Sequence, residues 1–283
     1  MEIKRVGVIG CGLMGAGIVE TCARAGYQVL VREVNAELLA KGMQRCNSSL
    51  SRAVERGRLT QSEMDDAWAR ITGTVKLQDL AESDLVIEAV IENMAEKKRI
   101  FAEMDTLCPP ETIIASNTSS LCVTEMAVAT GRPDKVLGLH FFNPVPVMPL
   151  LEMVRTILTS NETMQVAQQF GASLKKTTIV AKDTPGFIVN LLLVPYMLSA
   201  IRALEAGVAT REDIDNAMKL GCNHPMGPLT LLDFVGLDTA YYIANVMYEE
   251  FREPQYAPPP LLKRMVLAGF LGRKAGKGFY DYS

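Results

Sequence analysis

The chain has 283 residues, a length that is long for one domain and comfortable for two. Its hydrophobic content of 48% and charged content of 22% are ordinary for a globular protein and argue against disorder. A net charge of −3 gives no electrostatic reason to expect nucleic acid or an anionic membrane as partner. The sequence contains neither the ~20 consecutive apolar residues of a membrane span nor a secretory signal pattern at its start, so we expect a cytoplasmic protein.

The N-terminal segment RVGVIGCGLMGAGIVETCARAGYQVLVRE predicts a strand, a glycine-rich turn, a helix and a second strand in succession. Val6 to Ile9 is a short apolar run rich in β-branched residues, which is typical of a buried strand. Apolar residues then recur at helical intervals as far as Gly26. The following run, QVLVRE, predicts the next strand, which closes in Glu33.

The turn has the GxGxxG spacing of a dinucleotide-binding loop. Its first glycine permits the tight turn, its second lets the backbone approach a pyrophosphate, and its third lets helix and strand pack closely. The helix that follows offers N–H groups and a positive dipole end to the phosphates. A glycine-rich turn that binds nothing is the alternative. The predicted cofactor contacts in this loop are Gly10, Gly12, Leu13, Met14 and Gly15.

Glu33 lies where an acidic residue can bind the ribose hydroxyls of a dinucleotide. Its carboxylate would repel the 2′-phosphate of NADP, because both groups are negatively charged. We therefore predict NAD as the cofactor.

Further strand-like runs follow, with helical patterns between several of them, notably at 36–56 and 95–107. Strands that alternate with helices indicate an α/β sheet, which binds ligands at the carboxyl ends of its strands. The polar stretches IEN, SNTSS and HFFNP each follow a strand and predict a site at one edge, although turn chemistry alone is an alternative. The runs are Asp84–Val90, Thr112–Ser116, Val136–Phe142, Leu150–Val154 and Thr177–Ala181.

The pattern changes at KDTPGFIVN, where Pro185-Gly186 breaks the chain and helical periodicity replaces strands. Ile188–Leu204 is apolar over most of its circumference and needs burial against the first domain or a second subunit. Pro195 should bend this helix. We predict a Rossmann-type α/β domain with a mostly parallel sheet over 1–183 and an all-α substrate and dimerisation domain over 184–283.

The six cysteines form no CxxC pair and have no metal-ligand spacing with a histidine. Several lie in apolar stretches, so we predict buried, reduced thiols and no metal site. These residues are Cys11, Cys22, Cys46, Cys108, Cys122 and Cys222.

His140 is one of two histidines and lies at the end of a predicted strand. A histidine normally titrates near neutrality, so it can take a proton and return it. Glu152, at the start of the next strand, could bond to the other ring nitrogen and fix the tautomer. The alternative is a packed core histidine. We interpret His224 as a turn or helix-start residue, and Asp233 and Asp238 as surface or capping acids.

Several motifs together resemble one family: GVIGCGLMGAGI, SNTSSL, GLHFFNPVPVM, KDTPGFIVN, EDIDNAMKLG, HPMGPL and GRKAGKGFYDY. Over essentially its whole length the chain resembles the 3-hydroxyacyl-CoA dehydrogenases, and most closely the short-chain 3-hydroxybutyryl-CoA dehydrogenases of bacteria. The resemblance implies hydride exchange between NAD and C3 of a (3S)-3-hydroxyacyl-CoA. It also implies a homodimer formed through the helical domain.

The resemblance assigns roles to individual residues. His140 corresponds to the acid/base of the family and Glu152 to its paired glutamate. Ser119 and Asn190 correspond to residues that contact the reacting oxygen. The further cofactor contacts implied are Glu33, Glu92, Lys97, Ser119, Asn143 and Lys274.

CoA contacts would fall on Ser49 and Arg56, in the long helix that follows the second strand. Two positions depart from many relatives, which have a lysine at Pro149 and an arginine at Leu191. Both lie near the implied site, so they bear on acyl-chain and thioester-carrier preference.

Two other functions are compatible with the sequence. The same hydride chemistry could act on a carrier-bound 3-hydroxyacyl group or on a free hydroxy acid such as L-gulonate. A non-catalytic NAD-binding protein could use the same fold. Loss of the histidine, glutamate, serine or asparagine would be the mark of that protein, and all of them are present here.

Overall fold

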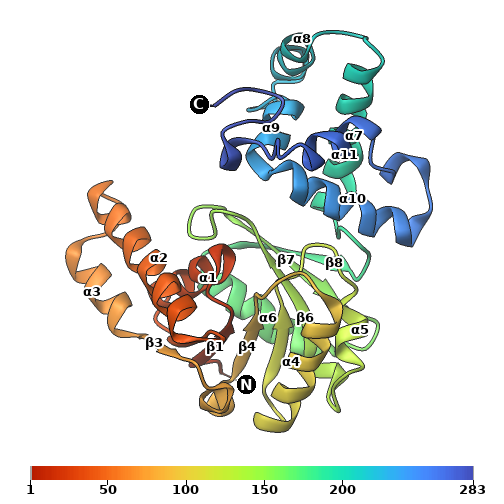
Figure 1. Cartoon of the computed structure of the whole chain (residues 1–283). Coiled ribbons are helices and arrows are strands. Elements are labelled where there is room, and N and C mark those ends of the chain that lie inside the picture. Colours follow the sequence, from red (N-terminus) through yellow and green to blue (C-terminus); the bar gives the residue numbers. More distant parts are fainter. Residues whose placement is uncertain (1, 283) are drawn as a thin grey trace. The chain divides into compact units, whose positions relative to one another are not determined.

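A computed structural model describes residues 2–282, which form two compact units divided between Thr184 and Pro185 (Figure 1). The first unit contains an eight-stranded sheet with the strand order β3-β2-β1-β4-β5-β6-β7-β8. The strands are β1 (Arg5–Ile9), β2 (Gln28–Arg32), β3 (Ile71–Thr74), β4 (Leu85–Glu88), β5 (Ile113–Ser116), β6 (Val136–Phe141), β7 (Leu150–Arg155) and β8 (Thr177–Lys182).

Side-chain caps start most of the longer helices of this unit. The Asn35 side chain accepts the N–H of Leu38 at the start of α2, and Thr60 forms a capping box with Glu63 at α3. The helices are α1 (Leu13–Arg24), α2 (Ala36–Glu55), α3 (Gln61–Ala69), α4 (Met94–Leu107), α5 (Val123–Ala127) and α6 (Asn161–Ser173), with short 3₁₀ turns η1 (Leu77–Glu82) and η2 (Pro133–Lys135).

Both faces of the sheet are buried along the central strands β1, β4, β5 and β6. On one face, strand residues such as Val8 and Leu139 pack with Ile18 of α1 and Phe170 of α6 in a single apolar cluster. Successive strand residues point to opposite faces, and α4 and α5 contact the sheet through β4 and β6. This explains why the central strands are nearly continuous apolar runs rather than alternating ones.

Neighbouring strands are parallel except for β6 and β7, which are antiparallel. The carboxyl ends of β1, β4, β5 and β6 therefore lie along one edge of the sheet, where the predicted polar stretches follow their strands. The predicted α/β class with a mostly parallel sheet is confirmed. The prediction did not include β3, a four-residue strand at the edge of the sheet, or α3 before it.

The second unit is helical, as predicted. Its apolar core includes Leu198 and Ile201 of the first helix, which contains Pro195. Among residues 185–282 the only strand-like pairing is two isolated bridges through Lys277. The helices are α7 (Val189–Glu205), α8 (Arg211–Asn216), α9 (Pro228–Val235), α10 (Leu237–Phe251) and α11 (Pro260–Leu267), with short turns η3 (Ala217–Gly221), η4 (Pro254–Tyr256) and η5 (Arg273–Ala275).

Asp233 is not the surface or capping acid that the sequence suggested. It is buried, and its carboxylate accepts the N–H groups of Phe279 and Tyr280 at 2.8 and 2.9 Å and the hydroxyl of Tyr282 at 3.1 Å. The prediction is wrong because the C-terminal segment returns to α9 from far along the chain. Asp238 lies in the first turn of α10 and pairs with Lys274.

The cysteines are buried in four of the six cases; Cys122 is half-buried and Cys222 is exposed. The predicted burial is thus wrong for Cys222, which follows a short π-helical turn. Burial raises the pKa of Cys108 to about 11 and also raises that of Cys22. Within residues 2–282, no helix has both the length and the apolarity to cross a membrane.

One thiol of the folded chain should react rapidly with a disulfide reagent such as dithionitrobenzoate, half-buried Cys122 should react more slowly, and the four buried thiols should react only after unfolding. Cys222 is the exposed one, and thiol reactivity requires access and a thiolate. Stopped-flow absorbance of the native protein measures the fast phase, and Cys222→Ser should remove it. A fast phase that survives in Cys222→Ser would contradict the assignment.

Candidate active site

His140 and Glu152 meet across the antiparallel pair β6 and β7. The ladder places the two residues directly opposite each other, and His140 Nδ1 lies 2.7 Å from Glu152 Oε2. Both side chains are buried, and the ring of Phe142 lies 4.5 Å from the imidazole, centre to centre. Strand pairing thus brings together two residues twelve positions apart in sequence.

The carboxylate determines which imidazole nitrogen carries the proton. An ionised carboxylate only accepts hydrogen bonds, so Nδ1–H of His140 donates to Glu152. The basic lone pair is then on Nε2, the nitrogen on the other side of the ring. An imidazole oriented in this way is suited to accept a proton and to be stabilised once it is charged.

The glycine loop fits the pyrophosphate of a dinucleotide. Gly10 has φ +94°, and a Cβ at Gly15 would lie 1.9 Å from the carbonyl oxygen of Gly10, so strand and helix approach as the motif requires. A Cβ at Gly12, in contrast, would meet no atom within 4 Å. No side chain caps the first turn of α1 and no acid lies in it. Open backbone and uncapped N–H groups together form a cradle for an anion.

Glu33 follows β2 and is tied to this loop. Its Oε1 accepts the N–H of Cys11 at 2.6 Å, and its Oε2 accepts the N–H of Val34 at 3.1 Å. The half-buried carboxylate therefore lies beside the predicted pyrophosphate site. This placement is compatible with a role in holding ribose hydroxyls.

Lys97 of α4 lies in a buried ion network. Its Nζ is 2.6 Å from Oε1 of Glu88 and 3.2 Å from Oε2 of Glu92. Lys97 and Glu88 are almost fully buried, while Glu92 is partly accessible. Ser116 donates to the second oxygen of Glu88 at 2.6 Å, which joins the network to β5.

The network continues into the SNTSS loop. The N–H of Ser119 donates to Glu92 Oε1 at 3.0 Å, and the hydroxyl of Thr118 donates to the same oxygen. Asn117 accepts the N–H of Phe141 at 2.9 Å, one residue from His140. The loop after β5 is thereby anchored to both β4 and β6. Within this unit, the predicted site residues thus form two groups: Glu92, Lys97 and Ser119 in one network, and His140 with Glu152 in a buried pair.

The remaining predicted site residues do not belong to these contacts. Asn143 is exposed in the segment between β6 and β7. Ser49 and Arg56 lie on the last turns of α2 and at its C-cap. Asn190, in the first turn of α7, and Lys274, which pairs with Asp238, belong to the second unit. Their catalytic and binding roles remain predictions.

Glu88 is the site residue that the sequence reading missed. It occupies a continuous apolar run, LVIEAV, and a buried carboxylate in such a strand needs a partner. Lys97, nine positions on, was visible as a basic residue near the start of a predicted helix. Their pairing depends on α4 packing back against β4, a tertiary feature that sequence spacing does not give.

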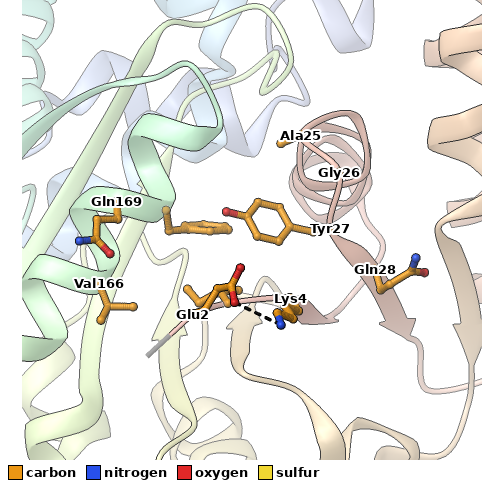
Figure 2. Close-up of a pocket in the computed structure, with 10 residues that line it drawn as sticks. Glu2, Lys4, Ala25, Gly26, Tyr27, Gln28, Val166 and Gln169 are labelled. Carbon is orange, nitrogen blue, oxygen red and sulfur yellow. Dashed lines mark ion pairs between the residues drawn. The ribbon is translucent and has the colours of Figure 1, made fainter.

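A pocket elsewhere in the first unit contains none of the predicted site residues (Figure 2). It lies near the amino ends of β1 and β2, at the opposite edge of the sheet. Figure 2 shows the ion pair of Glu2 with Lys4, at 3.2 Å, and Tyr27, whose ring packs against that of Phe170. In α/β sheets ligands bind at the carboxyl ends of the strands, so we place the candidate site at the His140 edge.

Comparison with known proteins gives close relatives. The chain is 53% identical over 282 residues to a 3-hydroxybutyryl-CoA dehydrogenase of Mycobacterium tuberculosis, covering 99% of each chain. The crystal structure of M. tuberculosis FadB2 matches with a TM-score of 0.98 at 52% identity, over the full length of both chains. That of the (S)-3-hydroxybutyryl-CoA dehydrogenase PaaH1 from Ralstonia eutropha matches with 0.95 at 44%, again over both full lengths.

Two family models divide the chain between them. Residues 5–184 match the NAD binding domain of 3-hydroxyacyl-CoA dehydrogenase, and residues 186–282 match its C-terminal domain. Together with the cradle at Gly12 and the carboxylate of Glu33, the first match accounts for NAD as the cofactor. The chain therefore belongs to the 3-hydroxyacyl-CoA dehydrogenase family and is an NAD-dependent oxidoreductase.

Proposed function

We propose that the protein catalyses the reversible oxidation of (3S)-3-hydroxyacyl-CoA, in particular 3-hydroxybutyryl-CoA, to the 3-ketoacyl-CoA. The observation that carries this proposal is the buried pair of His140 and Glu152 at the carboxyl edge of an NAD-binding sheet. The names of the relatives, 3-hydroxybutyryl-CoA dehydrogenases at 53% and 46% identity, support the substrate class.

Each residue has a defined task in this proposal. NAD, when bound, supplies the acceptor for the hydride that leaves C3. His140 takes the hydroxyl proton on Nε2, and Glu152 stabilises the imidazolium that results. Ser119, anchored through its N–H on Glu92, would help to hold the reacting oxygen. In the reverse direction His140 returns its proton to the same oxygen.

A basic face of α2 supports CoA as the carrier of the acyl group. Arg45, Ser49, Arg52 and Arg56 follow one another at intervals of four, three and four residues, so they share one side of the helix. All three arginines are exposed. Guanidinium groups pair well with phosphates, and CoA carries several of them.

Replacing Arg56 by glutamine should raise the KM for acetoacetyl-CoA about fivefold and leave the KM for NADH unchanged. The estimate is that of one exposed charge pair, about 1 kcal/mol. Steady-state kinetics measures it, and acetoacetyl-N-acetylcysteamine, which has the thioester but no phosphate, is the matched control. An equal change in KM for both substrates would mean that Arg56 does not bind the phosphates of CoA.

The proposed activity is tested by following NADH absorbance during reduction of acetoacetyl-CoA. Longer 3-ketoacyl-CoA, carrier-protein thioesters, a free 3-keto acid and NADPH are assayed in parallel. We expect fast turnover of acetoacetyl-CoA with NADH. Turnover of only a carrier-bound or free substrate would overturn the CoA assignment, and binding of NADH with no turnover of any substrate would indicate a non-catalytic protein.

Two further expectations rest on the sequence. The homodimer through the C-terminal helices remains a prediction, as does the cytoplasmic location. α7 exposes Leu192 on its surface, which is compatible with a partner subunit.

A further inference from the structure

The β6–β7 loop, residues 142–149, joins the strand of His140 to the strand of Glu152 and contains Asn143. Within it, the N–H groups of Val147 and Met148 both donate to the carbonyl of Pro144 at 2.9 Å. These hydrogen bonds close the turn on itself. They do not fix the position of the loop relative to the sheet, which depends on contacts with other elements.

One contact with another element comes from Lys176, the residue directly before β8. Its Nζ donates to the carbonyl oxygens of Val145 and Met148, at 2.5 and 2.6 Å. Val145 is a central residue of the turn, and Met148 is one of the residues that close it onto Pro144. A single ammonium group thus links the centre of the turn to its closing end.

The loop has two further outside contacts. The N–H of Thr177 donates to the carbonyl of Pro149 at 2.7 Å, and α1, the helix of the glycine loop, packs against Val145. Gly17 packs so closely on Val145 that a Cβ added to the glycine would lie 2.8 Å from the Val145 Cβ. Val145 is buried in this contact. Gly17 lies two positions after Gly15, the last glycine of the cofactor loop. The β6–β7 loop is therefore held between Lys176 and the helix that presents its N-terminus to the cofactor.

The surroundings of Lys176 are unusual for a lysine. It is half-buried, and among residues 2–282 no carboxylate forms an ion pair with it. Partial removal from water lowers the pKa of Lys176, and nearby Arg24 adds to this effect. The ammonium group of Lys176 is therefore stabilised by the two loop carbonyls rather than by a carboxylate.

We propose that Lys176 is a positioning residue: it holds the β6–β7 loop against α1 in the conformation in which Asn143 contacts the nicotinamide cofactor. For the role of Asn143 this inference rests on the family resemblance, which implies that Asn143 contacts the cofactor. The pairing of His140 with Glu152 is supported by the β6–β7 ladder and does not need Lys176. Loss of the clamp should therefore weaken cofactor binding much more than it slows proton transfer.

The test compares Lys176→Met with Lys176→Arg and with Lys175→Met, a neighbouring exposed lysine. NADH is titrated by its fluorescence, without acyl-CoA, so that the result does not depend on the substrate assignment. We expect the Kd of NADH to rise about tenfold in Lys176→Met, because two carbonyls lose their donor. The Kd of NADH should return part of the way to the wild-type value in Lys176→Arg, and it should stay within about twofold of that value in Lys175→Met. At saturating NADH, kcat should fall less than threefold.

Hydrogen exchange at Val147 and Met148 reports on the loop directly and should accelerate in Lys176→Met. A wild-type Kd with unchanged exchange would overturn the proposal, and so would a lowered melting temperature with an unchanged Kd, which would mean a purely structural role. If Lys176→Met does not fold, Lys176→Gln makes the same comparison, since its shorter amide cannot reach both carbonyls. Failure of the wild-type protein to reduce acetoacetyl-CoA would contradict the proposed substrate. It would not contradict this inference, because NADH binding is measured without acyl-CoA.

Discussion

Replacing His140 by glutamine is expected to lower kcat for acetoacetyl-CoA reduction roughly 10²- to 10⁴-fold, the contribution of a positioned acid/base. The Kd of NADH should stay within about twofold, because the glycine loop and Glu33 are untouched. The physical reason is that glutamine fills the space beside Glu152 but has no group that accepts a proton near neutral pH. Stopped-flow absorbance of NADH measures the rate, and fluorescence titration the Kd.

Glu152→Gln should produce a smaller decrease, roughly 10- to 10³-fold. The amide oxygen still accepts the Nδ1–H of His140, so the tautomer survives, but the negative charge that stabilises the imidazolium is lost. His224→Gln is the matched control, since that histidine contacts Tyr196 in the helical unit. A kcat within twofold of wild type in His140→Gln would refute the proton-transfer role.

Replacing Lys97 by methionine is expected to lower the free energy of unfolding by about 3–5 kcal/mol, the usual cost of removing one member of a buried ion pair. Glu88 would keep its buried charge with only Ser116 and a backbone N–H as donors. Glu92 would lose its cation as well, so the SNTSS loop that it anchors should loosen. Urea denaturation followed by circular dichroism gives the free energy.

Lys98→Met is the matched control for this prediction. Lys98 is the next residue on α4, and its ion pair with Glu125 is exposed, so its loss should cost less than about 1 kcal/mol. Adding Glu88→Gln to Lys97→Met removes the uncompensated charge, so the double variant should be more stable than the sum of the two single effects. If Lys97→Met and Lys98→Met have the same free energy of unfolding, the buried network of Lys97 does not stabilise the fold more than an exposed ion pair does.

The sequence alone was enough for the features that depend on local pattern. The strand–turn–helix–strand order and the Gly10 to Gly15 loop are short-range, and the breaker at Pro185-Gly186 marks a change in periodicity that needs no tertiary information. His140 and Glu152 could be proposed as a pair because both lie at strand ends, and two consecutive strands joined by a short connection pair readily.

Only the tertiary structure decided which polar groups meet. Glu88 and Lys97 are ordinary charges in sequence, and α4 packing on β4 makes them a buried pair that anchors Ser119 through Glu92. Lys176 likewise finds the carbonyls of a loop about thirty residues away. Asp233 was misread because its partners come from the returning C-terminal segment. Periodicity reports the backbone's local conformation, whereas a polar side chain is satisfied by whatever the fold brings beside it.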